Sequence, residues 1–173
     1  MPFETLFKKR KIKKTHHYFP LKDSTFRNKD LIKGINVIVS GNMTMSTMTE
    51  KFEKNFIKKI KSKHALMVNS GSSANLLALQ CLINPYRKNK LKKGDEVLIP
   101  AVCWPTSLWP IIQCGLKPVF VDVDKNNLNI DLDDLKKKIS NKSKALMLVH
   151  VLGISTNMDE LLKIIKRKKI ILI

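Results

Sequence analysis

The 173-residue sequence is poor in cysteine and acidic residues, and it lacks a long apolar run. Its three cysteines, Cys81, Cys103 and Cys114, are an odd number without a CxxC pair, which argues against a disulfide framework and a structural zinc site. The longest apolar stretch, 146–154, is interrupted by His150 and falls short of the ~18 residues that a membrane span needs. The basic start offers no signal-peptide core. These features predict a soluble, reduced, cytoplasmic protein with no membrane partner and no metal site.

Acidic residues are outnumbered by basic ones, 14 to 33, which gives a formal net charge of +19. Such a charge raises the hypothesis of a basic nucleic-acid-binding module. Only four of the basic residues are arginines, whereas proteins that bind bases and phosphates favour the bidentate arginine fork. Asparagine and isoleucine are also abundant, so a drift toward A/T-rich codons explains the lysines without any partner. We favour drift, and we interpret the densest basic cluster, 8–14, as a solvated tail.

Two regions are predicted from the periodicity of the sequence. Residues 1–45 carry little periodicity and predict an N-terminal arm with a short helix near Asp30. Residues 46–173 begin with a capping-box pattern, Thr47–Glu50, that starts a helix ending near Ser62. Predicted strands then alternate with predicted helices: strands over 64–69, 96–100, 118–123, 144–151 and 170–173, and helices over 72–83, 106–114, 132–140 and 159–167. This alternation is typical of an α/β domain with a mainly parallel sheet flanked by helices.

The printed chain stops inside a predicted buried strand, 170–173. A parallel strand normally leads into a loop and another helix, and ligands of such sheets bind at the carboxyl ends of the strands. We therefore expect the loop after residue 173 to be part of the site. We also expect this domain to be truncated at its C-terminus.

One candidate binding segment, 69–75 (NSGSSAN), joins the first predicted strand to a helix. Small residues, free helix-terminal amides and two hydroxyls suit a phosphate. The segment has neither the GK[ST] of a Walker loop nor a GxGxxG fingerprint. A serine-capped helix start after a glycine turn explains the same letters. The local chemistry leaves both interpretations open.

Five other residues carry functional and structural interpretations. Trp104 follows a predicted strand, where an aromatic side chain can stack on a flat ring, or can pack under a loop. Cys103 is interpreted as a small buried filler. Asp122 and Asp124 are interpreted as carboxylates that end a strand and open a turn. His150 is interpreted as a core histidine that hydrogen-bonds to a neighbouring backbone group.

Together these stretches resemble the DegT/DnrJ/EryC1/StrS family of pyridoxal-phosphate-dependent sugar aminotransferases. The matching segments are MVNSGSSANLLAL (67–79), GDEVLIPAVCWPTSLWPIIQCGLKPVFVDVD (94–124), NLNIDLDDL (127–135), VHVLGISTNMDELL (149–162) and TMSTMTEKFEKNF (44–56). The resemblance implies the large domain of fold-type I transferases for residues 46–173, with pyridoxal 5′-phosphate as the cofactor. The sequence departs from the family's pattern at three positions. Ser46 stands where glycine is common, Cys103 where threonine is usual, and Ile154 where glutamine or asparagine is frequent.

The resemblance assigns roles to four residues. Gly71, Ser72 and Ser73 match the small-residue turn that holds the cofactor phosphate, and Trp104 matches the aromatic that stacks on the pyridine ring. The aspartate that pairs with the pyridine nitrogen and the lysine that bonds to the cofactor are expected after residue 173. No catalytic residue can therefore be placed in this chain, and we expect the chain alone to be inactive.

The resemblance implies an enzyme that transfers an amino group, with glutamate as the expected donor, to a nucleotide-linked keto-sugar. Its product would feed a surface polysaccharide, and the enzyme would be a homodimer. The wording MVNSGSSANLL and PAVCWPTS is also similar to the branch that contains nucleotide-sugar 3-dehydrases, in which a histidine replaces the lysine. A dehydrase on the same scaffold is thus the first alternative. A nucleic-acid-binding module and an inactive interaction remnant are the others.

Overall fold

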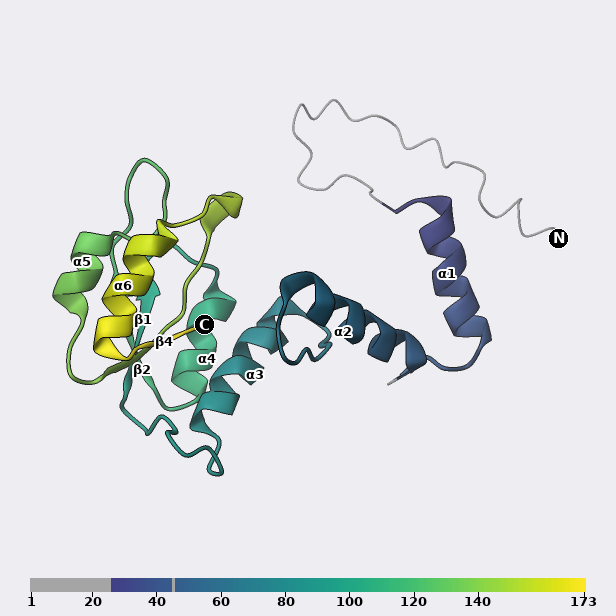
Figure 1. The fold of residues 1–173 in the computed structure, drawn as a ribbon, viewed down its shortest axis with the longest axis horizontal. Coiled ribbons are helices and arrows are strands. Elements are labelled where there is room, and N and C mark those ends of the chain that lie inside the picture. The colour runs from purple at the N-terminus through teal and green to yellow at the C-terminus, as the bar shows by residue number, and fades with distance from the viewer. Residues whose placement is uncertain (1–25, 45) are drawn as a thin grey trace. The chain divides into compact units, whose positions relative to one another are not determined.

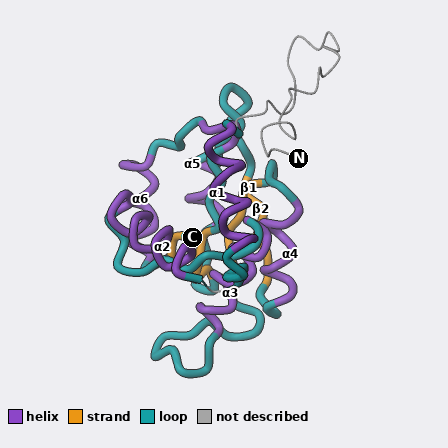
Figure 2. The backbone as a smooth tube through the Cα atoms, turned by 90° about the vertical axis from the view of Figure 1, so that its right-hand side faces the viewer, coloured by secondary structure: helices purple, strands orange, loops and turns teal. Residues whose placement is uncertain are grey.

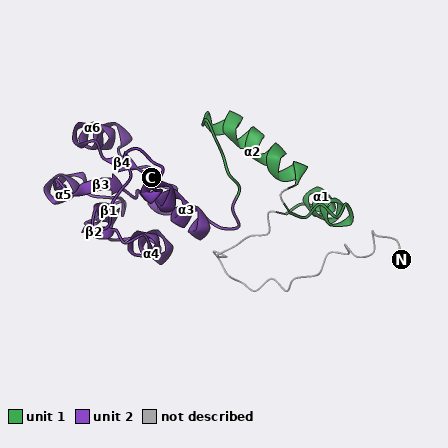
Figure 3. Cartoon of the chain, turned by 90° about the horizontal axis from the view of Figure 1, so that it is seen from below, with its two compact units in different colours: residues 1–67 green, residues 68–173 purple. Residues whose placement is uncertain are grey.

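The computed structural model describes residues 26–44 and 46–173, so the predictions for the basic cluster 8–14 and the rest of 1–25 lie outside the described residues. The chain divides into two compact units, 1–67 and 68–173 (Figure 3). The boundary predicted at residues 45 and 46 stays a prediction. Within the described ranges, no helix is long and apolar enough to cross a membrane.

The first unit contributes two amphipathic helices, α1 (Asn28–Val39) and α2 (Thr47–Ile60). Helix α1 confirms the helix predicted near Asp30. Helix α2 is capped by Ser46, whose Oγ accepts the Met48 N–H at 3.3 Å, so the predicted cap at Thr47 is wrong by one residue. Neither helix has a buried residue, and most of their large apolar side chains are exposed: Leu31, Ile32, Ile38, Val39, Met48, Phe52, Phe56 and Ile60.

The second unit is built on a four-stranded parallel sheet with flanking helices (Figures 1 and 2), and its strands lie in the order β2-β1-β3-β4 (Figure 3). The strands are β1 (Glu96–Pro100), β2 (Lys117–Val121), β3 (Ser143–Leu146) and β4 (Ile171–Leu172). The helices are α3 (Gly71–Ile83), α4 (Pro105–Gln113), α5 (Leu132–Lys138) and α6 (Met158–Lys168), with a 3-10 turn, η2, at Val151–Gly153. The predicted fold class, a parallel sheet flanked by helices, is confirmed.

Helices cover both faces of the sheet because its strands are apolar on both sides. Val97 and Ile99 of β1 belong to the core cluster that includes Leu79 and Ile111 from α3 and α4. Leu98, between them in sequence, belongs to the second cluster, with Leu135, Leu161 and Ile165 from α5 and α6. Successive residues of a strand point to opposite faces, so β1 contributes to both cores. Figure 3 shows α5 and α6 on one side of the strands and α3 and α4 on the other.

Two predicted strands differ from the structure. The segment 64–69 forms no strand, because no neighbouring strand hydrogen-bonds to it, and Leu66 and Met67 within it are exposed. The strand predicted over 144–151 ends at Leu146, and its last predicted residue begins the 3-10 turn instead. In both places an apolar run of residues predicted a strand. A strand also needs a neighbouring strand to hydrogen-bond with, and the apolar run does not show whether one is present.

The sheet is fastened at its amino edge by Glu96, the first residue of β1, which is only 7% exposed. Its carboxylate accepts hydrogen bonds from Ser140 Oγ at 2.5 Å and Ser143 Oγ at 3.3 Å, and it pairs with Lys117 Nζ at 3.4 Å. The Ser140 hydrogen bond, helped by Lys117 and Ser143 and opposed by burial, lowers the pKa of Glu96 from its ordinary 4.5. One carboxylate thus joins the starts of β1, β2 and β3.

Replacing Glu96 with glutamine should lower the free energy of unfolding at pH 7 by about 1.5–3 kcal/mol, since hydrogen bonds to a charged group are lost in a buried place. Because the folded-state pKa is lowered, this contribution is present above the ordinary pKa and is lost as pH falls through the lowered value. Urea unfolding of both proteins at pH 7 and pH 3 measures it. The control is Glu160→Gln, which removes an exposed pair with Lys136 and should cost at most about 1 kcal/mol. Equal losses in the two variants at pH 7 would contradict the assignment.

Candidate functional site

The amino end of α3 presents free backbone N–H groups. Ser70 caps the helix, and its Oγ accepts the Ser73 N–H at 3.1 Å. The N–H groups of Gly71 and Ser72 come before any intrahelical acceptor and have no partner among the described residues. A Cβ built on Gly71 meets no atom within 4 Å, so the space in front of this turn is open. Two unpaired donors at a helix amino end fit an anionic oxygen cluster such as a phosphate.

A cavity of about 290 Å³ lies where α3 meets α4. Ser72 and Ser73 line it, together with Leu76, Thr106, Trp109, Pro110 and Gln113. Neither Gly71 nor Trp104 is among its lining residues. Sequence reasoning missed Thr106, Trp109 and Gln113 as candidates. Their spacing, with Pro110, is that of one helix face, so the helical periodicity carried a signal that could have found them.

Trp104 is the residue before the first turn of α4, four residues after β1 ends at Pro100. Its side chain is 73% exposed, so the interpretation that it packs under a loop is wrong. An exposed indole at this edge has a free face on which a flat ring can stack. Its assignment as a cofactor-stacking residue stays a prediction.

A side-chain contact ties the two candidate segments together. Asn75 Nδ2 donates to the Thr106 carbonyl at 3.3 Å and contacts Ser107 Oγ at 3.5 Å. The Thr106 carbonyl is free to accept because Pro110, four residues later, has no N–H to donate to it. The first turn of α4, which follows Trp104, is therefore held by α3.

The remaining candidates take structural roles. Asp122 and Asp124 accept the backbone N–H groups of Val123 and Asn126, as expected for carboxylates that open a turn. The described residues contain no group of three His, Cys, Asp or Glu side chains that could hold a metal ion.

His150 and the cysteines complete the set of candidate residues. His150 Nδ1 accepts the Thr156 N–H at 3.3 Å, which confirms the backbone hydrogen bond, but the residue is exposed, so the prediction of a core histidine is wrong. It follows β3 outside the sheet, in the segment where the predicted strand does not continue.

Cys103 packs against the first core cluster, and burial raises the pKa of its thiol, which suits a filler. All three cysteines are free.

Comparison with known proteins agrees with this arrangement. The profile of the DegT/DnrJ/EryC1/StrS aminotransferase family matches residues 24–173. The chain is 44% identical to a GDP-4-keto-6-deoxy-D-mannose 3-dehydratase of Yersinia pseudotuberculosis, over 90% of this chain and 39% of that protein. It is 35% identical to a GDP-perosamine synthase of Vibrio cholerae, over 65% of this chain and 29% of that protein.

Solved structures give the same result. The GDP-4-keto-6-deoxy-D-mannose-3-dehydratase of E. coli, with bound hydrated PLP, superposes with a TM-score of 0.82 at 42% identity, over 89% of this chain and 39% of that chain. This chain spans about 39% of the length of these dehydratases. The profile match over 150 residues, the parallel sheet and the small-residue turn at α3 agree, and the chain belongs to the DegT/DnrJ/EryC1/StrS aminotransferase family.

Proposed function

We propose that this chain is the phosphate-binding and ring-stacking part of a pyridoxal-phosphate-dependent enzyme that acts on a nucleotide-linked keto-sugar in polysaccharide biosynthesis. The observation that supports it best is the pair of unpaired N–H groups at Gly71 and Ser72, close in the fold to the turn that follows Trp104. The three unpaired cysteines and the small-molecule substrate are consistent with a cytoplasmic enzyme.

The residues present fit the cofactor in kind. The N–H groups of Gly71 and Ser72 and the hydroxyls of Ser72 and Ser73 are donors for a phosphate, and the Trp104 indole offers a face for the pyridine ring. When bound, pyridoxal phosphate supplies an electron sink for charge that develops on the substrate. This chain's own part is to bind and orient that group. Proton transfer at the substrate is expected from the lysine or histidine of the family's pattern, which is expected after residue 173.

Pyridoxal phosphate should bind the 173-residue chain weakly, and Trp104→Ala should weaken it further. Loss of stacking is worth about 0.5–1.5 kcal/mol, which corresponds to a two- to twelvefold lower affinity. Titration followed by tryptophan fluorescence and by isothermal calorimetry measures this, with no turnover expected. Tyr86→Ala, at another exposed aromatic residue, should leave the affinity unchanged.

A second variant distinguishes an effect on phosphate binding from an effect on the stability of the fold. Gly71→Ala places a methyl group in open space at the start of a helix, so the free energy of unfolding should stay the same or rise slightly. The methyl group stands where the phosphate is expected, so the affinity for pyridoxal phosphate should fall. Unchanged affinity in both Gly71→Ala and Trp104→Ala would contradict the proposed site.

The reaction of the whole protein has two candidates. The sequence motifs favour amino transfer, with a 3-dehydrase as the alternative. The dehydratases from Yersinia pseudotuberculosis and Escherichia coli are 44% and 42% identical to this chain, whereas the perosamine synthase from Vibrio cholerae is 35% identical. This difference favours dehydration of a GDP-linked 4-keto-6-deoxy sugar, and amino transfer from glutamate is the second candidate.

Incubation of the full-length enzyme with GDP-4-keto-6-deoxymannose and ¹⁵N-glutamate distinguishes the two reactions by mass spectrometry. A dehydratase yields a sugar with one oxygen fewer and no ¹⁵N. An aminotransferase yields a ¹⁵N-labelled amino sugar that keeps its 3-hydroxyl. We expect the first product, together with a histidine at the cofactor-facing position after residue 173. A ¹⁵N-labelled sugar would overturn the dehydratase proposal.

We infer that the full-length protein forms a homodimer. The support is the exposed apolar face of α2, on which the rings of Phe52 and Phe56 stack with centroids 5.8 Å apart. Large exposed apolar patches of this kind mark interaction surfaces. Light scattering should report a dimer for the full-length protein and a shift toward monomer for Phe52→Glu. Lys51→Glu, on the same helix, is the matched control and should stay dimeric. A monomeric wild-type protein would contradict the inference.

A further inference from the structure

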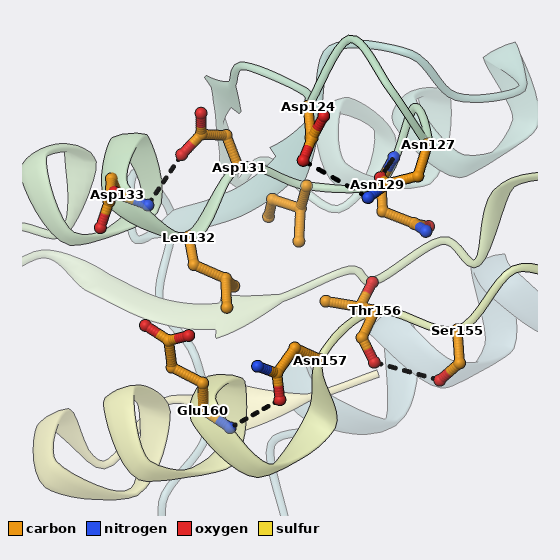
Figure 4. Close-up of a pocket in the computed structure, with 11 residues that line it drawn as sticks. Asp124, Asn127, Asn129, Asp131, Leu132, Asp133, Ser155, Thr156, Asn157 and Glu160 are labelled. Carbon is orange, nitrogen blue, oxygen red and sulfur yellow. Dashed lines mark hydrogen bonds between the residues drawn. The ribbon is translucent and has the colours of Figure 1, made fainter.

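A second cavity, of about 300 Å³, lies between the segments 124–133 and 155–160, with Asn129 and Thr156 in its wall (Figure 4). The hydrogen bonds drawn between its lining residues join neighbours within one segment, and two of them cap the helices α5 and α6. Its lining includes four carboxylates: Asp124, Asp131, Asp133 and Glu160. These polar side chains serve the turns and helix ends around them, and none of them contacts α3 or α4.

Asn75 makes a different kind of contact, because its side chain reaches from α3 to α4. Its Nδ2 donates to the Thr106 carbonyl at 3.3 Å and contacts Ser107 Oγ at 3.5 Å. A carbonyl oxygen only accepts, so the nitrogen of the Asn75 amide must face it. Asn75 is half-buried and Ser107 is 7% exposed, so water is partly excluded from the contact. In the described part of the chain, no other hydrogen bond joins α3 to α4.

From the first turn of α4, the contact continues to Trp104. The Ser107 N–H donates to the Trp104 carbonyl at 2.8 Å, and Trp104 is the residue at which α4 begins. Pro110 has no N–H to donate to the Thr106 carbonyl, so this oxygen is open to the Asn75 amide. The backbone that carries the indole is thus bonded to a turn that Asn75 ties to α3.

At its other end, Asn75 is close to the phosphate-binding turn. Gly71 and Ser72 precede it by four and three residues, and residues at this spacing are neighbours on a helix. The apolar contacts between the two helices involve residues further along, such as Leu79 and Ile111 in the first core cluster. Asn75 therefore supplies the polar contact that lies nearest to the amino ends of both helices.

We propose that Asn75 is a positioning residue that holds the Trp104 indole in place relative to the phosphate-binding turn of α3. The inference rests on the proposed function, because this spacing matters only to a ligand that contacts both ends. Pyridoxal phosphate carries its phosphate and its ring in one small molecule, so a displaced indole weakens its binding. Inorganic phosphate needs the N–H groups alone. Loss of the Asn75 amide should therefore affect the first ligand and not the second.

The test compares the two ligands on the ¹⁵N-labelled 173-residue chain. Asn75→Leu keeps the approximate size of the side chain and removes the donor. Its affinity for pyridoxal phosphate should fall at least about twofold, and by no more than the two- to twelvefold expected for Trp104→Ala. The shifts that inorganic phosphate causes in the Gly71 and Ser72 amide resonances should saturate as in the wild type. Gln80→Leu removes an amide from an exposed position of α3 and is the matched control for both ligands.

A double-mutant cycle tests whether Asn75 acts through Trp104. Asn75→Leu should not lower the affinity for pyridoxal phosphate any further when Trp104→Ala is already present. Equal losses in the two backgrounds, equal losses for the two ligands, or unchanged affinity in Asn75→Leu would overturn the inference and leave the proposed site standing. Absence of pyridoxal phosphate binding to the wild type would instead overturn the proposed function, and this inference with it.

A third variant separates positioning from stability. Pro110→Ala supplies the N–H that the Thr106 carbonyl lacks within its own helix. Added to Asn75→Leu, it should restore any loss of thermal stability in the first turn of α4 without restoring the affinity for pyridoxal phosphate, because the turn is still not bonded to α3. Recovery of the affinity together with the stability would show that Asn75 has a structural role only, and would overturn the inference.

Discussion

Burial of both faces of the parallel sheet is the constraint on which the rest of the second unit depends. All five residues of β1 are buried, and Val97, Leu98 and Ile99 alternate between two separate cores. Each core is covered by its own pair of helices, and a helix follows each of β1, β2 and β3 and returns the chain to the edge where the next strand begins. The carboxyl ends of β1, β2 and β3 consequently meet at the opposite edge. The first turn of α4, which borders the candidate site, follows β1 at this edge, where ligands of parallel sheets bind.

The sequence could predict elements whose signal is local. The continuous apolar run of β1 and the strong amphipathic pattern of α6 each determine a type of structure without reference to a distant neighbour. The segment 64–69 has an equally apolar composition, but a strand also needs a partner with free hydrogen-bonding groups, and the described sheet provides none there. His150 shows the same limitation for burial, since the predicted strand ends before it and a 3-10 turn begins at the next residue, Val151.

Sites assembled across the fold were only partly predictable. Ser72 and Ser73 lie in the same turn as the helix cap Ser70, so a binding role for them could be suggested from neighbouring residues in the sequence. The contribution of Thr106 required knowing that α4 packs beside α3. The wall formed by Asn129 and Thr156 joins residues from two loops whose separation is set by α5, β3 and the chain after it. The net charge of +19 was also uninformative about the surface near individual cavities, because one cavity of this basic chain is lined by four carboxylates.

The missing N–H of Pro110 has a consequence for motion. In an unbroken helix, the carbonyl of Thr106 would be held by its own helix, and the first turn of α4 could fray or re-form independently of its surroundings. Here the Asn75 side chain donates a hydrogen bond to that carbonyl, so the first turn of α4 is joined to the second turn of α3 by this side-chain amide. Opening of the first turn of α4 therefore also breaks a contact with α3, and the spacing between the amino ends of the two helices depends on this amide as well as on the packing of Leu79 and Ile111 in the first core cluster.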